Sequence, residues 1–407
     1  MKCRHCGNPL SHTFLDMGHA PPSNAYLNEI DLSRPETYYP LKIMVCEHCW
    51  LVQTEDYADP DFLFSPEYAY FSSTSSGWLA HVANYCKQVT KDFALGSNSL
   101  VIEVAANDGY LLKNFVASAI PCLGIEPTAS TAQVAERLGI PILREFFSQK
   151  LGQQLAVNGQ QADLIIANNV FAHVPDINDF TRGMKSALKP DGVITLEFPH
   201  LMRLLEYTQF DTVYHEHFSY LSLFTVNQIL TAAGLRAWRV EELETHGGSL
   251  RVYACHAEDN RKIQPSLSVL LEEEANRGLQ TLVPYQGFQE RCNSLKNNLI
   301  AFLIEQKRKG KTVAAYGAAA KGNTLLNYAG IKPDLLPFVC DAATAKQKKF
   351  LPGSHIPIFE PAELDRHPPD FVLILPWNLA AEVMDQLAHL RASGTQFVTA
   401  VPSLLIR

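Results

Sequence analysis

Residues suited to acid–base chemistry concentrate between Tyr214 and Tyr220. This segment holds two histidines, a glutamate and two tyrosines within seven residues. Imidazole exchanges protons near neutral pH, and a neighbouring carboxylate or phenol can orient it or share its proton. In a regular strand, the side chains of Tyr214 and Glu216 would face away from that of His217. For all three to converge on one site, the segment must be a loop or a helical turn.

The chain around this segment is long enough for several domains. Its 407 residues predict roughly two or three of them. The apolar share of 47% and the charged share of 19% are typical of a soluble protein with buried cores. A net charge of -8 argues against nucleic acid as a partner. No apolar run is long enough to span a bilayer, and Met1–Cys6 is not an apolar signal segment. We therefore expect a cytoplasmic protein without a membrane partner, and its oligomeric state, monomer included, stays open.

Four of the nine cysteines form two CxxC pairs, Cys3 with Cys6 and Cys46 with Cys49. This spacing lets both thiolates of a pair reach one tetrahedral Zn²⁺, and two pairs complete a shell of four sulfurs. We predict a zinc site in preference to a redox dithiol or unrelated buried cysteines. The zinc would be structural, because a filled shell has no open position for catalysis. The five scattered cysteines are expected to be small buried apolar residues.

Alternating strands and helices fill the middle of the chain. Apolar strands are predicted at 99–104, 122–125, 163–169 and 193–197, and a helix at 223–233. A helix is also expected to lead into a loop at 188–192. Glu126 ends the second strand, close to the offset at which an acidic side chain meets a ribose in nucleotide-binding folds. Two final strands, near 238–240 and 247–254, predict an antiparallel edge on a mostly parallel sheet.

Residues 261–309 have helical periodicity and are predicted to be a connector that packs against both of its neighbours. A second α/β unit follows, with strands expected at 312–316, 338–341, 356–359, 371–375 and 396–401. Its turn, Gly317–Asn323, opens a helix, so its backbone N–H groups could hold a phosphate, with Lys321 adding charge. In isolation, this glycine pattern fits an NAD site about as well.

Several long motifs resemble a known family. Asp-Leu-Ile-Ile-Ala-Asn-Asn-Val-Phe-Ala-His-Val-Pro-Asp from Asp163, and Leu-Lys-Pro-Asp-Gly from Leu188, resemble the S-adenosylmethionine-dependent methyltransferases with a Rossmann-like core. Together with the CxxC pairs, Tyr-His-Glu-His-Phe-Ser-Tyr-Leu-Ser from Tyr214 and Gly-Gly-Ser-Leu-Arg from Gly247 resemble one branch, the C-methyltransferases of nucleotide-linked keto-deoxysugars. The resemblance covers essentially the whole chain. One departure is Ala105, which stands where the family usually has a glycine.

The resemblance implies a role for each matching residue. His217 would be the base, Tyr214 would hydrogen-bond the keto oxygen or the base, and Glu216 would orient a histidine or a sugar hydroxyl. His215 is expected to be a packing or backbone-bonded imidazole. His173 and Tyr68 fall where the family has pocket residues. By its own composition, the aromatic segment 66–75 suits a lid over an organic ligand, but this stretch alone favours a strand followed by a helix cap at Ser75 or Ser76. The cofactor-binding residues would be Glu103, Ala105, Asn107, Gly109, Glu126, Asn168 and Asn169, and the substrate-binding residues Tyr70, Gly248, Arg251 and Lys321.

These observations predict an α/β protein in three parts. Residues 1–60 would form the zinc-binding domain, 61–260 the methyltransferase domain, and 261–407 a helical connector with a C-terminal Rossmann-like domain that helps to bind the sugar nucleotide. The expected reaction transfers a methyl group to a ring carbon, C3 being favoured, next to the ketone of a 4-keto-deoxysugar. Two alternatives stay open: an NAD-dependent sugar-nucleotide oxidoreductase and a non-catalytic, zinc-organised binding protein.

Overall fold

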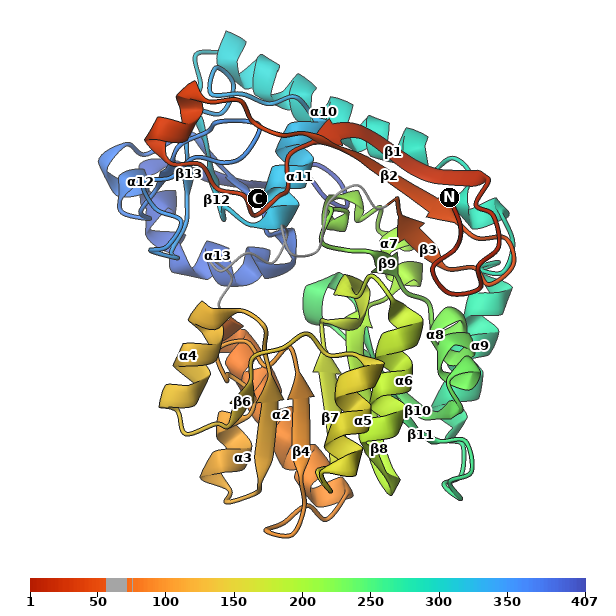
Figure 1. The fold of residues 1–407 in the computed structure, drawn as a ribbon. Coiled ribbons are helices and arrows are strands. Elements are labelled where there is room, and N and C mark those ends of the chain that lie inside the picture. The colour runs from red at the N-terminus through yellow and green to blue at the C-terminus, as the bar shows by residue number, and fades with distance from the viewer. Residues whose placement is uncertain (56–71, 75) are drawn as a thin grey trace.

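The computed structural model describes residues 1–55, 72–74 and 76–407, and these residues form three β-sheets. Figure 1 shows a lower lobe built on a seven-stranded sheet and an upper lobe that holds the N-terminal and C-terminal sheets. The predicted α/β class, with a small N-terminal module and a second α/β unit at the end of the chain, is confirmed.

The seven-stranded sheet has the order β10-β11-β8-β7-β4-β5-β6. β11 is antiparallel to both of its neighbours and the other pairs are parallel, as predicted. Parallel strands are usually covered on both faces, and β7 shows this: Leu164 and Ile166 belong to one core, Ile165 and Ala167 to another. The strands are β4 (Val101–Val104), β5 (Cys122–Ile125), β6 (Ile142–Leu143), β7 (Ala162–Asn168), β8 (Leu188–Pro199), β10 (Leu235–Leu243) and β11 (Ser249–His256).

Helices cover this sheet and connect its strands. Residues 188–192 differ from the prediction of a loop, because β8 already begins at Leu188. Leu188 pairs with Ala162 ahead of a register shift, so the ladder continues into a segment rich in turn-forming residues. The helices are α2 (Ser76–Asp92), α3 (Lys113–Ala117), α4 (Ala129–Arg137), α5 (Gln149–Val157), α6 (Ile177–Ala187), α7 (Leu201–Glu206) and α8 (Leu223–Ala232).

The N-terminal sheet is antiparallel and has the order β1-β2-β3-β9. β1 (His12–Ala20), β2 (Tyr39–Val45) and β3 (Val52–Thr54) come from the cysteine-rich region. The fourth strand, β9, is Ser219–Tyr220, the end of the acid–base segment, and it pairs with Val52 and Gln53. The cysteine-rich module therefore holds one end of that segment in place.

The C-terminal sheet is parallel except for its last strand, and has the order β14-β13-β12-β15-β16-β17. The predicted helical connector is confirmed as α9 (Pro265–Asn276) and α10 (Phe288–Arg308). It touches both neighbours, because Glu274 of α9 accepts from the N–H groups of Leu223 and Phe224, and Phe302 of α10 meets Phe371 of β15. The remaining elements are β12 (Val313–Tyr316), α11 (Ala320–Tyr328), β13 (Val339–Cys340), β14 (Ile358–Phe359), α12 (Glu363–Arg366), β15 (Phe371–Ile374), α13 (Ala380–Gln386), β16 (Gln396–Thr399) and β17 (Leu405–Ile406).

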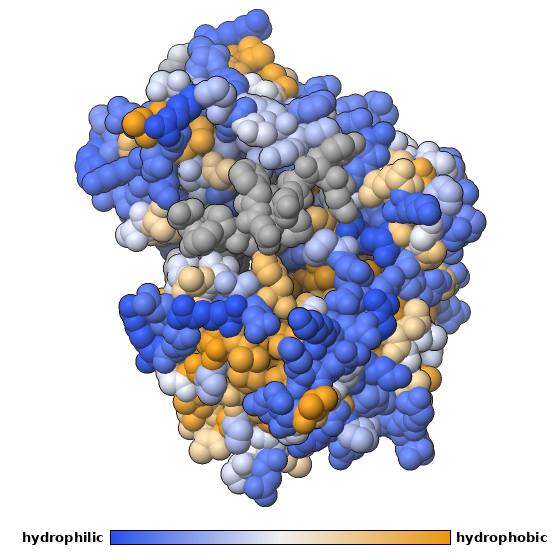
Figure 2. Space-filling model, in the orientation of Figure 1, coloured by the Kyte–Doolittle hydropathy of each residue, from blue (hydrophilic) through white to orange (hydrophobic). Residues whose placement is uncertain are grey.

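The apolar residues of the described chain lie mainly in three buried clusters. On the face drawn in Figure 2, hydrophilic residues cover most of both lobes, and apolar residues gather in one area of the lower lobe. None of the described helices has both the length and the apolar content needed to cross a membrane. The five scattered cysteines are buried, as expected.

Candidate active site and zinc centre

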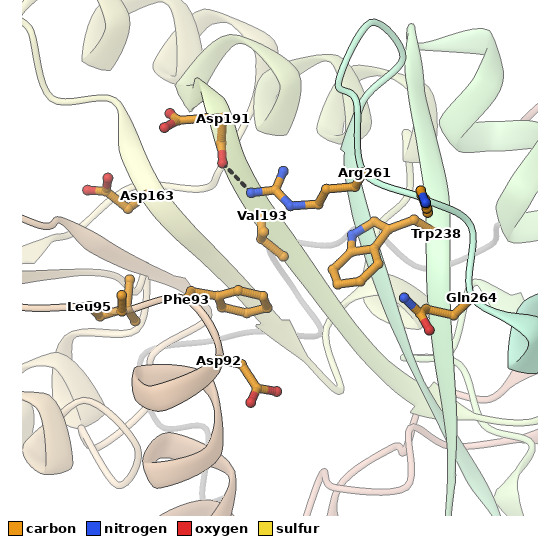
Figure 3. A pocket seen from close by; sticks show the side chains of 11 residues that line it. Asp92, Phe93, Leu95, Asp163, Asp191, Val193, Trp238, Arg261 and Gln264 are labelled. Atoms are coloured by element: carbon orange, nitrogen blue, oxygen red, sulfur yellow. Dashed lines mark hydrogen bonds between the residues drawn. The ribbon is translucent and has the colours of Figure 1, made fainter.

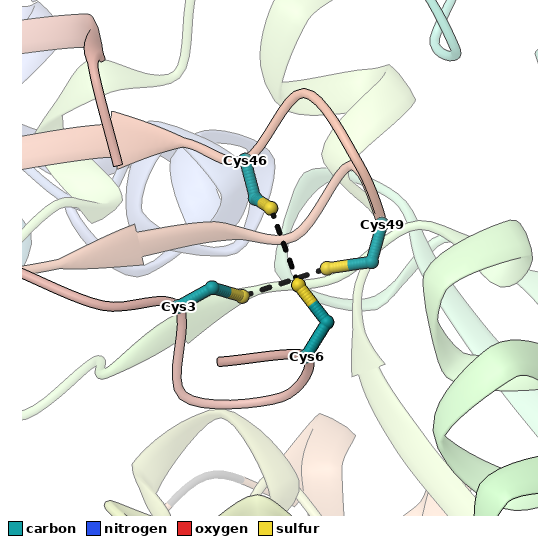
Figure 4. A group of neighbouring side chains, drawn as sticks. All are labelled: Cys3, Cys6, Cys46 and Cys49. Atoms are coloured by element: carbon teal, nitrogen blue, oxygen red, sulfur yellow. Dashed lines mark hydrogen bonds between the residues drawn. The ribbon is translucent and has the colours of Figure 1, made fainter. Parts of the chain in front are cut away.

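The two cysteine pairs face one another beside the N-terminal sheet (Figure 4). The Sγ atoms of Cys3, Cys6, Cys46 and Cys49 lie within 4.8 Å of one another, with 3.5 Å between Cys3 and Cys49 and 3.5 Å between Cys6 and Cys46. A Zn–S bond of about 2.3 Å separates the sulfurs of a tetrahedral centre by about 3.8 Å, so this group fits a zinc ion. Four protein sulfurs leave no open position, and the zinc they hold is structural.

Backbone and amide groups around the sulfurs support the same assignment. The Gly7 N–H donates to the Cys3 carbonyl and the Trp50 N–H to the Cys46 carbonyl, each at 2.9 Å, so the two knuckles have the same turn. Gln53 Nε2 donates to Cys3 Sγ at 3.2 Å, and Asn8 Nδ2 to Cys6 Sγ at 3.3 Å. Donors of this kind orient and stabilise metal-binding groups. No motif in the sequence marked Gln53, which is fully buried.

The acid–base segment forms a turn immediately before β9. Its turn residues are 215 and 216, and the His217 N–H donates to the Tyr214 carbonyl at 3.0 Å. The rings of Tyr214 and His217 lie 4.0 Å apart between centroids. The expected loop is confirmed, and it brings together two side chains that a strand would direct to opposite faces.

The protonation state of His217 follows from its hydrogen bond. Its Nδ1 lies 2.9 Å from the Thr212 carbonyl oxygen, which can only accept, so Nδ1 carries the proton and Nε2 has the free lone pair. The side chain is buried. Burial lowers the pKa of His217 well below its usual value, and the charges of His173 and Lys321 lower it further. His217 is therefore a neutral imidazole with a basic nitrogen near neutral pH.

His173 links this imidazole to the edge of the parallel sheet. It ends the short helix η3 (Phe171–His173), which follows the carboxyl end of β7, and its ring centroid lies 4.6 Å from that of His217. Burial lowers the pKa of His173 to about 4. The structure thus brings His173, Tyr214 and His217 together at the edge where ligands bind in such sheets. Tyr68 and Tyr70 lie outside the described residues.

Glu216 receives a partner from the N-terminal module. Its carboxylate is 2% exposed and accepts from Asn24 Nδ2 at 2.8 Å and 3.0 Å. Asn24 follows β1, and no motif in the sequence marked it as a site residue. His215 lies 3.3 Å through Nε2 from the Tyr39 carbonyl, so the expectation of a backbone-bonded imidazole is confirmed.

The turn after β4 contains three residues with positive φ. Ala105 has a φ of 58°, Asn107 of 49° and Gly109 of 78°. Alanine thus adopts the left-handed conformation, at a cost of roughly 1–2 kcal/mol. The Glu126 carboxylate holds the turn by accepting from the N–H groups of Asn107 and Thr128, each at 2.9 Å.

Several polar side chains at this edge have buried atoms with no hydrogen-bond partner among the described residues. Examples are Glu103, through Oε2, Asp108, through Oδ1, and Asn168, through both amide atoms. Glu103 is 1% exposed and Asn168 6% exposed, and burial raises the pKa of Glu103 well above its usual value. Unpaired buried polar atoms are costly, so their presence at the carboxyl ends of β4 and β7 indicates a place for a polar ligand. This fits the amino-acid and ribose groups of S-adenosylmethionine.

His246 is a neighbour of this site that sequence reasoning missed. Asn169 Nδ2 donates to its Nε2 at 3.3 Å, and its ring lies 5.4 Å from that of Trp78. Both Asn169 and His246 have positive φ values, 52° and 55°. Burial lowers the pKa of His246 to about 4. The available signal was its position directly before the Gly-Gly-Ser-Leu-Arg motif.

Gly248 and Arg251 have structural contacts. The Arg251 side chain is 3% exposed, donates to Glu197 at 2.7 Å and to Glu241 at 3.3 Å, and lies over the Tyr85 ring. Gly248 has a φ of 114°, and a Cβ there would lie 2.7 Å from Arg203 Cγ. These contacts engage the Arg251 guanidinium within the sheet, and contact of either residue with substrate stays a prediction.

The glycine turn of the C-terminal unit lies between the two lobes. Lys321, in the first turn of α11, is partly buried and donates to Asn378 Oδ1 at 2.9 Å. At the end of β13, the Asp341 carboxylate accepts from the Ala318 N–H at 2.7 Å and lies 3.5 Å from Lys346 Nζ. Tyr26, from the N-terminal module, donates to the Ala318 carbonyl at 2.6 Å. The crevice where a dinucleotide would bind in this second sheet therefore already contains protein groups.

A separate pocket of about 490 Å³ lies at the opposite edge of the seven-stranded sheet (Figure 3). Asp163, at the start of β7, and Trp238 and Arg261 are among its lining residues. The Arg261 guanidinium donates to the Asp191 carbonyl across it. None of the predicted site residues lines this pocket.

Comparison with known proteins gives matches along the whole chain. A family model described as "Putative zinc binding domain" matches residues 3–64, "Methyltransferase domain" residues 78–240, and "C-methyltransferase C-terminal domain" residues 244–402. The chain is 32% identical over 401 residues to the C-methyltransferase NovU of Streptomyces niveus, covering 98% of this chain and 95% of that protein.

Solved methyltransferase structures align with part of the chain. The magnesium protoporphyrin IX methyltransferase of Synechocystis PCC 6803, with bound S-adenosylmethionine, is 15% identical, with 44% of this chain and 80% of that chain covered and a TM-score of 0.34. An S-adenosylmethionine-dependent methyltransferase of Clostridium acetobutylicum is 10% identical, with 44% and 92% covered and a TM-score of 0.35. TM-scores this low support no conclusion, and the family is shown by the relative that matches along the chain. From that relative and the three family models, the chain belongs to the S-adenosylmethionine-dependent C-methyltransferases that have an N-terminal zinc-binding domain.

Proposed function

We propose that this enzyme methylates a ring carbon, C3 in our assignment, next to the ketone of a nucleotide-linked 4-keto-deoxysugar, in the biosynthesis of branched-chain deoxysugars. The observation that carries the proposal is the convergence of Tyr214, His173 and His217 at the carboxyl edge of the parallel sheet. Carbon becomes a nucleophile only after losing a proton, and a ketone makes the neighbouring C–H acidic enough for an imidazole to remove it.

His217 is the base in this proposal. Its Nδ1 is held by the Thr212 carbonyl, which fixes the tautomer and leaves Nε2 to accept the substrate proton. The low pKa of His217 keeps the imidazole unprotonated before the reaction. His173, in edge contact with the ring, restricts its orientation.

The neighbouring groups act on the charge that develops. As the proton leaves, the ketone oxygen becomes an enolate oxygen, and a hydrogen-bond donor beside it lowers the barrier. We assign this contact to Tyr214, whose ring lies against His217. Glu216, held by Asn24, would orient a sugar hydroxyl. The burial of this segment excludes water, which strengthens each of these interactions.

The cofactor crevice lies on the same edge of the sheet. S-adenosylmethionine supplies the electrophilic methyl group when it is bound. Glu126 would accept from the ribose hydroxyls, and Glu103 and Asn168 have the unpaired polar atoms to bind the amino-acid part. Asn107 and Asn169 would shape the pocket around it. The alternative of an NAD-dependent oxidoreductase is less favoured, because Tyr26 and Lys346 already contact the groups around Asp341.

The test is methyl transfer by purified enzyme with S-adenosylmethionine and a panel of 4-keto sugar nucleotides. The expected product gains about 14 Da, the mass of one CH₂, in mass spectrometry. His217→Asn is expected to lower the rate by about 10²–10⁴-fold while still binding the cofactor. His215→Asn is the matched control, since it removes a neighbouring imidazole that bonds only to backbone in our assignment. Wild-type rates in His217→Asn would remove this residue as the base.

A further inference from the structure

Lys321 lies in the C-terminal α/β unit, on the helix that contacts the segment before Tyr214. It lies one helical turn before Thr324, whose Oγ1 donates to the Val213 carbonyl at 3.0 Å, directly before Tyr214. Residues three apart on a helix share a face, so the first turn of α11 presents Lys321 toward the same segment. The ammonium has three donors, and the structure gives it one hydrogen bond to a described residue, Asn378. Its partial exposure leaves the other donors available to a ligand.

A tryptophan next to Asn378 joins the two lobes at this point. Trp377 Nε1 donates to Asp211 Oδ2 at 2.7 Å, and Lys321 Nζ lies 4.7 Å from the Trp377 ring centroid. On the other side, Trp377 packs against Gly247, where a Cβ would lie 2.3 Å from the ring. Gly247 has a φ of 88° and its carbonyl accepts from Gln209 Nε2 at 2.7 Å. The Trp377 ring thus contacts Asp211 and Gly247 of the lower lobe, and the Lys321 ammonium lies against it.

The charges at this junction act on one another. Burial lowers the pKa of Lys321 to about 8, against the opposing effect of the Asp211 carboxylate. Burial also raises the pKa of Asp211 to about 6, against the effects of Lys321 and Trp377. The charge of Lys321 lowers the pKa values of both His217 and His246, so the ammonium is within electrostatic range of the base.

We propose that Asp211, Trp377 and Asn378 position the Lys321 ammonium at the active site, where it contacts a negatively charged oxygen of the substrate. This inference rests on the proposed function, which supplies two such oxygens: the enolate oxygen formed during the reaction and the diphosphate of the nucleotide. A cation near either one stabilises it strongly in a site that excludes water.

Lys321→Met distinguishes the two sources. If the contact is with the enolate oxygen, kcat falls by about 10²-fold while the affinity for nucleoside diphosphates, measured by calorimetry, is unchanged. If it is with the diphosphate, that affinity falls by about 10-fold or more and kcat is retained. Either result supports the contact. Unchanged kcat and unchanged affinity together overturn it.

Asp211→Asn tests the positioning role through the pH profile. The amide removes the negative charge that raises the pKa of Lys321, so the alkaline fall of kcat/KM is expected to move to lower pH by about one unit. His217 and His246 also face Lys321, but their lowered pKa values leave both uncharged in this range. Asp163→Asn is the matched control, because it breaks another Asp–Lys pair, with Lys189 at 2.7 Å, at the opposite edge of the sheet. A profile of Asp211→Asn that coincides with the wild-type profile overturns the positioning role.

Trp377→Phe separates positioning from folding. Phenylalanine keeps an aromatic ring beside Gly247 and Lys321 but loses the N–H that donates to Asp211. We expect kcat/KM to fall about 10-fold while the variant keeps a folded circular dichroism spectrum, although the unpaired Asp211 oxygen costs about 1–3 kcal/mol of stability. Wild-type kcat/KM in this variant contradicts the proposal. Failure of the proposed function would appear separately, as absence of methyl transfer by the wild-type enzyme. In that case, equal nucleoside diphosphate affinities of wild type and Lys321→Met also refute the anion contact.

Discussion

Replacing Asn24 with alanine should slow methyl transfer although Asn24 belongs to the zinc module. Its Nδ2 donates to both carboxylate oxygens of Glu216, at 2.8 Å and 3.0 Å, and the carboxylate is 2% exposed. Hydrogen bonds to a charged group contribute about 1.5–3 kcal/mol. If the transition state loses this stabilisation, kcat falls by about 10- to 150-fold.

The assay is single-turnover methyl transfer followed by mass spectrometry, with zinc content and melting temperature measured on the same preparation. Asn28→Ala is a matched control in the same loop, because Asn28 also donates to a carboxylate, that of Asp31 at 3.1 Å, but is exposed. It is expected to leave the rate unchanged. A rate for Asn24→Ala within about 2-fold of wild type, with zinc retained, would refute the idea that the zinc module positions Glu216.

Three further predictions concern stability. Removing zinc with a chelator is expected to lower the melting temperature and abolish methyl transfer together, because β9 pairs with β3 of the zinc module. Scanning calorimetry and activity assays on the same samples test this, and full activity of the metal-free protein would contradict it. Glu274→Ala is expected to lower the free energy of unfolding by about 3–5 kcal/mol, since its buried carboxylate accepts from the N–H groups of Leu223 and Phe224 and from His200. Urea denaturation measures this, with Glu272→Ala, at an exposed position of the same helix, as control. Finally, burial lowers the pKa values of His173 and His246 to about 4 in the folded protein, below the usual pKa of histidine. Because the unfolded state then binds more protons, the free energy of unfolding should decline as the pH falls from the usual histidine pKa toward about 4. A free energy of unfolding that does not change over this pH range would count against the burial of these rings.

Local patterns predicted much of the fold. Six of the seven strands of the seven-stranded sheet were predicted, and β7 alternates between two cores. β6 was missed, because it has only two residues and so shows no pattern. The CxxC spacing predicted the sulfur cluster because two thiols on one knuckle can reach a common centre. The prediction of a loop at residues 188–192 was wrong, because Leu188 pairs with Ala162 and β8 already begins there despite the turn-forming composition of this segment.

Contacts between distant segments could not be predicted in the same way. Asn24 and Glu216 are 192 residues apart, and Asp211 and Trp377 are 166 apart. No local period or spacing marks such partners. His246 was missed for a related reason, because its role depends on Asn169 from another strand end.

The sequence by itself determined the family, the zinc ligands and the identity of the acid–base segment, because these depend on residue types at short spacing. Only the tertiary structure decided how that segment is used: it turns at residues 215–216, holds His217 in one tautomer through Thr212, and takes its supports from both the zinc module and the C-terminal lobe. The physical reason is that hydrogen bonds and charges act through space, so the partners of a buried group are set by packing and not by their order along the chain.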